Sequence, residues 1–127
     1  MKIDMRNRPF KPLVYVCAPY SGDVAANVET AKRFAEYAYN TGNIPLTPHL
    51  LFPFMDDENE THREDAIVMD IVLMGKCNEV WVLDGRISDG MAFEIEKARR
   101  RRQTIRHFAF DYWSKTFHET NVTETEK

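Results

Sequence analysis

The chain has 127 residues, 43% of them hydrophobic, and a formal net charge of −3. This length fits one domain with a buried core, and the negative charge argues against nucleic acid as a partner, because nucleic-acid binders normally present a basic face. A small anionic ligand is still allowed, since a helix N-terminus can hold one. No apolar run is long enough to cross a membrane, so we expect no membrane partner.

Cysteine usage and the N-terminal sequence bear on cofactors and location. Cys17 and Cys77 lie in separate apolar runs and are expected to be reduced core thiols. Because the chain has no CxxC motif and no Cys/His cluster, we expect no metal site and no cofactor. Residues 1–12 are charged and lack the apolar segment of a signal peptide, which predicts a cytoplasmic protein.

Short apolar runs and segments with helical spacing alternate along the chain. The segments predicted as strands span residues 13–18, 43–48, 79–83 and 104–110. The segments predicted as helices follow Asp23, span residues 63–76 and run from Ser88 or Asp89 to about Arg101. This alternation predicts an α/β fold, with a parallel sheet of four or five strands and helices on both faces, in a flavodoxin/Rossmann-like three-layer sandwich.

The predicted domain occupies residues 13–117, between an N-terminal arm at residues 1–12 and a polar C-terminal tail at residues 118–127. Ligands in such sheets bind beyond the carboxyl ends of the strands. The turn after the first strand leads into a helix N-terminus, whose backbone N–H groups could hold a phosphate or a sugar hydroxyl; the alternative is an ordinary turn. The candidate binding residues of this turn are Pro19, Tyr20, Ser21 and Gly22.

Two carboxylates fall on the inward flanks of predicted helices. Asp70 lies three residues after Ile67, beside the apolar stripe of the second helix. Glu94 has the same offset from Met91 and Ile95 on the third helix. A carboxylate on the core side costs free energy unless it is paired, so the two could form an acid/base or nucleophile pair. The alternative for Asp70 is a place at the border of the apolar face, where it reaches water or a lysine.

Other polar residues follow strands or end a helix. Asp84 ends the third predicted strand and is either a pocket residue or a residue that starts a loop. His49 follows the second strand and is a further candidate for the pocket, although a lone His is usually structural. The basic run 99–102 is interpreted as the solvated end of a helix, and the acidic run 56–60 as a solvated loop.

Three sequence features together carry a family resemblance: the opening YVCAPYSG, the acidic Asp70 and the segment SDGMAFEIEKA. From about Leu13 to Phe108, the chain resembles the nucleoside 2-deoxyribosyltransferase family and its deoxynucleoside monophosphate N-glycosidase relatives. It is also similar to small uncharacterised domains of bacteria and phages that share a YVxxPYxG start and a PHLLFP centre.

The resemblance implies catalytic roles for residues that match the family pattern. Glu94 matches the family nucleophile, which attacks the anomeric carbon, and Asp70 matches an acidic residue around the ribose and base. Either Tyr15 or Tyr20 matches a tyrosine near that nucleophile. The implied catalytic set is Glu94, Asp70 and Tyr15.

The turn before the third helix corresponds to a family turn of small residues that contacts the 5′ side of the sugar. Ser88 and Gly90 are therefore expected to bind substrate. Asp89 departs from the family pattern and would disfavour a 5′-phosphate, for which Arg86 could compensate.

The implied activity is cleavage or transfer of the N-glycosidic bond of a (deoxy)nucleoside or nucleoside monophosphate, through a covalent glycosyl-glutamate intermediate. The expected partner is then a small-molecule nucleoside or nucleotide. Two alternatives stay open: a non-catalytic binder of a nucleotide or nucleotide-derived signal in the same pocket, and a structural interaction domain. Phe93 and the aromatic residues near the C-terminus indicate a homo-oligomer, a dimer or larger, unless they pack on their own domain.

Overall fold

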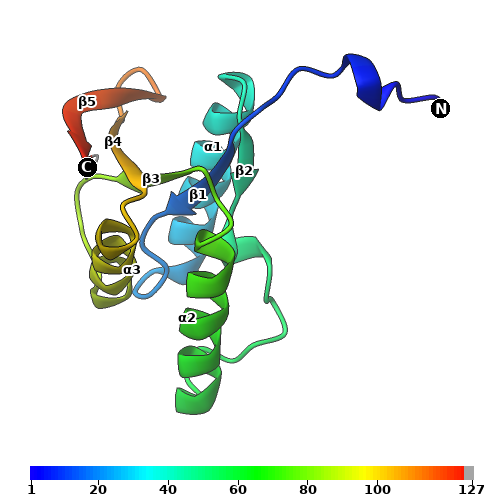
Figure 1. Cartoon of the computed structure of the whole chain (residues 1–127). Helices are drawn as coiled ribbons and strands as arrows, with labels where there is room; N and C mark the ends of the chain where they lie inside the picture. The colour runs from blue at the N-terminus through cyan, green and yellow to red at the C-terminus, as the bar shows by residue number, and fades with distance from the viewer. Residues whose placement is uncertain (125–127) are drawn as a thin grey trace.

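The computed structural model describes the backbone of residues 1–124 and the side chains of residues 1–120. Five strands in this part of the chain form one sheet in the order β2-β1-β3-β4-β5 (Figure 1). The strands are β1 (Leu13–Cys17), β2 (Ile44–Leu46), β3 (Glu79–Leu83), β4 (Thr104–Asp111) and β5 (Thr116–Glu124). The helices are α1 (Val24–Asn40), α2 (Glu60–Met74) and α3 (Asp89–Arg100), with short 3-10 helices η1 (Met5–Asn7) and η2 (Pro48–Leu50).

The sheet confirms the predicted α/β fold. β1 pairs in parallel with both β2 and β3, and β3 pairs in parallel with β4. Only the β4–β5 pair among the described strands is antiparallel. This strand order is that of flavodoxin-like sheets, in which the chain changes direction across the sheet between β1 and β3 and ligands bind at that point.

Alternation along β1 divides the core into two layers. Val14 and Val16 point to the face covered by α1, where they pack with Phe34. Tyr15 and Cys17 point to the opposite face, covered by α2 and α3. These four side chains are buried and Leu13 is half-buried, which explains why this strand is a continuous apolar run. The three-layer sandwich therefore presents Tyr15 and Cys17 to the helices that carry the predicted carboxylates.

The C-terminus corrects the predicted domain boundary. Residues 118–127 were expected to form a polar tail, but β5 runs from Thr116 to Glu124 and pairs with β4. The hairpin forms because Phe117 is buried against Phe34, with ring centroids 5.0 Å apart. Lys115, with a φ of 60°, makes the tight turn that precedes it. Residues 125–127 of the predicted tail lie outside the described residues.

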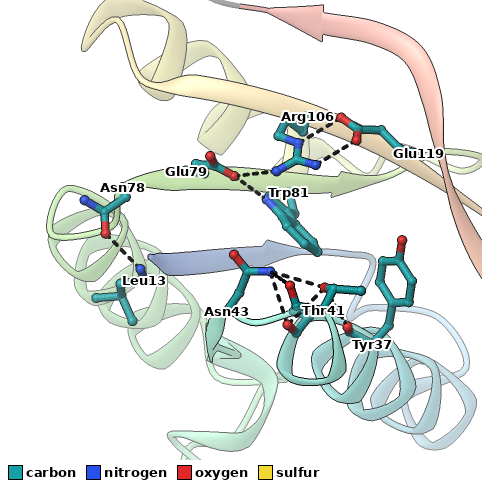
Figure 2. Close-up of polar contacts among 10 residues, drawn as sticks. Leu13, Tyr37, Thr41, Asn43, Asn78, Glu79, Trp81, Arg106 and Glu119 are labelled. Carbon is teal, nitrogen blue, oxygen red and sulfur yellow. Dashed lines mark hydrogen bonds and ion pairs between the residues drawn. The ribbon is translucent and has the colours of Figure 1, made fainter. Parts of the chain in front are cut away.

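A charged cluster joins the added strand to the sheet (Figure 2). Arg106 on β4 contacts Glu79 on β3 at 3.0 Å and makes a two-pronged contact with Glu119 on β5, at 2.7 and 2.8 Å. Its guanidinium also lies 5.0 Å from the ring centroid of Trp81. A bidentate Arg–carboxylate pair over an aromatic ring is one of the stronger surface arrangements, so this cluster favours the observed register of β5.

The aromatic residues near the C-terminus divide into two groups. Phe108 and Phe117 are buried in the core beside Phe34, with Phe108 at a centroid distance of 5.5 Å from it. These residues pack on their own domain. The predicted interface residues that remain exposed are Phe93, Tyr112 and Trp113. None of the helices in residues 1–124 combines the length and apolar character that a membrane span requires.

Candidate active site

A cavity of about 570 Å³ opens beyond the carboxyl end of β1, between the loop that follows it, η2, α2 and the N-terminus of α3. This is the place at which ligands bind in flavodoxin-like sheets. The structure brings seven of the predicted site residues together in its lining. They are Tyr20, Ser21, His49, Asp70, Ser88, Gly90 and Glu94.

Helix α3 positions Glu94 at this cavity. Ser88 caps the helix by accepting a hydrogen bond from the Met91 backbone N–H at 3.2 Å. Met91 and Ile95 are buried in the core, so Glu94, which lies between them on the helix, faces the end of β1. Its carboxylate is held by two β1 side chains: the Tyr15 hydroxyl donates to Oε2, and the Cys17 sulfur lies 4.0 Å from Oε1.

The surroundings of Glu94 determine its charge state. Burial raises its pKa to about 7, the hydrogen bond from Tyr15 opposes this rise, and the negative charge of Asp70 adds to it. Burial, followed by the charges of Glu94 and Asp70, raises the pKa of Tyr15 far above its ordinary value. Tyr15 therefore stays protonated and acts as a hydrogen-bond donor. It orients the carboxylate and favours its ionised form.

Asp70 lines the same cavity from α2. Burial raises its pKa to about 7. Its Oδ1 atom is buried and has no hydrogen-bond partner among the described residues. Because Asp70 and Glu94 both titrate near neutral pH and interact electrostatically, one can hold a proton while the other is ionised. Such a pair suits a reaction that needs one acid and one nucleophile or base.

Tyr15 and four predicted binding residues lie outside the lining. Tyr15 is fully buried beneath Glu94. The Pro19 carbonyl lies 2.9 Å from His49 Nε2, and Arg86 donates to the Ser21 carbonyl, beside Gly22. Gly22 has a φ of 100°, a conformation that favours glycine in this turn.

Asp84 also supports the sheet edge instead of facing the cavity. Its Oδ1 atom lies 2.8 Å from His107 Nδ1 on the neighbouring strand β4. Four residues that were expected to contact a ligand are therefore absent from the cavity lining: Pro19, Gly22, Asp84 and Arg86. Pro19 and Arg86 instead fix the loops around the cavity.

Sequence reasoning missed one wall of the cavity. The acidic segment expected to be a solvated loop borders the opening through residues 56–58. It is tied to α2, because the Asp56 backbone N–H donates to His62 Nδ1 at 2.9 Å and Arg63 donates to the Asp57 carbonyl at 3.1 Å. His62 and Arg63 line the cavity as well, and so do the apolar side chains Phe52 and Met55. One sequence signal was the PHLLFP segment that precedes this loop.

No group of three or more His, Cys, Asp or Glu side chains in the described part of the chain is placed to hold a metal ion. Among the described residues, the lining has one Lys or Arg, which is Arg63, and five acidic side chains, which are Asp56, Asp57, Glu58, Asp70 and Glu94. The cavity therefore favours ligands that carry hydrogen-bond donors or positive charge over ligands with several negative charges.

Comparison with known proteins shows the family to which the sequence belongs. A family model described as a domain of unknown function (DUF7768) matches residues 12–108, which include the whole predicted resemblance and end before β5. The chain belongs to the DUF7768 family. No curated protein sequence matches it.

Solved structures of two enzymes share the fold. A 2-deoxyribosyltransferase from Bacillus psychrosaccharolyticus aligns with a TM-score of 0.62 at 13% identity, over 76% of this chain and 72% of that one. A 2-deoxyribosyltransferase from Leishmania mexicana aligns with a TM-score of 0.53 at 17% identity, over 79% of this chain and 65% of that one, slightly less than two thirds of its length. These likenesses confirm the predicted resemblance at the level of the fold.

Proposed function

We propose that this DUF7768 domain cleaves or transfers the N-glycosidic bond of a (deoxy)nucleoside or its monophosphate, through a covalent glycosyl intermediate on Glu94. One observation carries the proposal: the Glu94 carboxylate, held by the Tyr15 hydroxyl, and the Asp70 carboxylate, whose Oδ1 has no partner among the described residues, share one cavity at the carboxyl edge of the sheet. The structural likeness to two 2-deoxyribosyltransferases supports it.

In the first step, an ionised Glu94 oxygen attacks C1′ of the sugar. The hydrogen bond from Tyr15 is made to Oε2, and Oε1 has only the weak contact with the Cys17 sulfur at 4.0 Å, so Oε1 is the attacking atom. The C1′–N bond breaks as the new C1′–O bond forms, and the bonding electron pair goes to the ring nitrogen of the base. Asp70, protonated when Glu94 is ionised, donates its proton to the departing base. The transition state has oxocarbenium character, which the nearby carboxylate stabilises.

In the second step, water or another base attacks C1′ from the opposite side. The ester bond to Glu94 breaks, the carboxylate is regenerated, and Asp70 accepts the proton of the incoming nucleophile. Two inversions give net retention at C1′. Tyr15 is a positioning residue, because it touches the nucleophile and not the substrate.

The charge of the lining bears on the 5′ substituent. Asp89 is exposed at the start of α3, next to Ser88 and Gly90 in the cavity wall. The guanidinium of Arg86, expected to balance it, donates a hydrogen bond to the Ser21 carbonyl and does not line the cavity. An uncharged nucleoside therefore fits this lining better than a nucleoside monophosphate does.

The test is product analysis of the wild-type protein with a panel of 2′-deoxynucleosides and their 5′-monophosphates, with and without an added acceptor base. We expect free base to appear by chromatography with at least one uncharged deoxynucleoside. Binding of a panel member without release of any base would contradict an enzymatic function and would support the non-catalytic binder.

A further inference from the structure

The position of His49 fixes which of its ring nitrogens carries the proton. His49 lies in η2, directly after β2, with Nε2 at 2.9 Å from the Pro19 carbonyl oxygen. A carbonyl oxygen only accepts hydrogen bonds, so Nε2 must be the protonated nitrogen. Burial lowers the pKa of His49 below its ordinary value, which keeps the ring neutral. Nδ1 therefore presents an unprotonated lone pair.

That lone pair has no partner within the described residues. His49 Nδ1 is buried, and His49 belongs to the cavity lining. The only other cavity-lining side chain in the described chain with a buried, unpartnered polar atom is Asp70, whose Oδ1 is also an acceptor when ionised. Two unpartnered polar atoms in one cavity, of which His49 Nδ1 is an acceptor in the neutral ring, favour a ligand with hydrogen-bond donors, because a buried polar atom without a partner is costly.

The surroundings of His49 suit a flat ligand. The Tyr20 ring lies beside it, with centroids 5.3 Å apart and planes inclined at 55°, and Phe52 lines the same cavity. Glu94 is held on the α3 side by β1, whereas His49 comes from beyond β2 on the other side of that strand. With the sugar C1′ at Glu94, the attached base extends toward this aromatic wall.

We propose that His49 Nδ1 accepts a hydrogen bond from an exocyclic amino group and thereby selects aminated bases, of the adenine or cytosine type. This inference rests on the proposed function for the placement of sugar and base. A base with a keto oxygen at that point would set two acceptors against each other. The ring cannot adapt by changing its tautomer, because the Pro19 carbonyl would then face the Nε2 lone pair.

Two pairs of free bases test the inference, each pair differing by a single amino group: adenine with purine, and cytosine with 2-pyrimidinone. Free bases have no glycosidic bond, so this titration does not depend on turnover and fails separately from the proposed function. We expect the aminated member of at least one pair to bind about tenfold more tightly to the wild-type protein, as for one well-formed hydrogen bond. In protein labelled with ¹⁵N-histidine, the His49 Nδ1 resonance should shift with that base and not with its partner.

The variant His49→Phe keeps a ring in the wall and removes the acceptor. It should bind both members of the pair with the affinity that the wild type shows for the unaminated one, and thermal melting checks that it folds. Equal affinities within both pairs, no binding of any of the four bases, or an unmoved Nδ1 resonance would overturn the inference. Equal weakening of both members by His49→Phe would also overturn it, since that result assigns His49 to stacking alone.

Discussion

Replacement of Glu94 by glutamine is expected to abolish turnover of any substrate that the wild-type protein processes, with kcat lower by at least about 10³-fold. The amide oxygen of glutamine can still accept the hydrogen bond from Tyr15, so the side chain keeps its place. The amide cannot, however, form the glycosyl ester. Because the change also removes a carboxyl group that burial disfavours in its ionised form, the variant should fold normally. Base release by the two proteins at equal concentration measures the effect.

The matched control for this substitution is Glu96→Gln on the same helix. Glu96 is exposed and forms surface ion pairs with Arg99 and Arg100, at 3.8 and 3.4 Å. Such pairs contribute about 0–1 kcal/mol to stability, so this variant should retain wild-type turnover. Equal activity of Glu94→Gln and Glu96→Gln would remove the nucleophile from the mechanism.

Replacement of Asp70 by asparagine is expected to lower kcat by about 10²–10⁴-fold, the usual contribution of a general acid or base. Asparagine has the same shape but cannot deliver a proton to the departing base. Asp65→Asn, an exposed position on the same helix, is the matched control and should leave kcat unchanged. Steady-state turnover of both variants against the wild type gives the result.

The substitution Asp70→Asn should also change how the stability of the fold depends on pH. The pKa of Asp70 is about 7 in the folded state and 3.8 as its ordinary value. Asp70 therefore keeps its proton to higher pH in the folded state than in the unfolded state. The free energy of unfolding that this proton contributes is fully present below about pH 4 and is lost as the pH rises through about 7. Asp70→Asn should thus be more stable than the wild type at pH 8, by a margin that closes toward pH 4, in denaturant unfolding. Lower stability at both pH values with unchanged kcat would show that Asp70 is structural.

The sequence was sufficient to predict the four parallel strands of the sheet and to place two carboxylates on the inward flanks of helices. Val14 and its neighbours form a short uninterrupted apolar run, which is typical of a strand buried on both faces. Asp70 and Glu94 could be placed because helical periodicity fixes the direction of a side chain relative to its buried neighbours. These predictions depend on the spacing of apolar residues within single strands and helices, which can be read from one sequence.

Features that depend on contacts between distant segments could not be predicted in this way. The hairpin strand β5 depends on Phe117 meeting Phe34, more than 80 positions earlier in the chain, and on the pairing of Arg106 with Glu119. The cavity wall at residues 56–58 depends on the hydrogen bond that His62 accepts from the Asp56 backbone N–H. The acidic sequence of this segment, taken alone, is typical of a solvated loop. Asp84 was placed at the correct sheet edge, but its contact with His107 belongs to the pairing of β3 with β4.

The central claim is that Glu94 carries the sugar between the two steps, and mass spectrometry tests this most directly. The wild-type protein would be mixed with a deoxynucleoside whose base it releases, quenched in acid during turnover and digested. We predict that the peptide containing Glu94 gains the mass of one deoxyribosyl group, and that the Glu94→Gln protein gains none. Release of base by a wild-type protein whose Glu94 stays unmodified at every quench time would contradict the covalent mechanism.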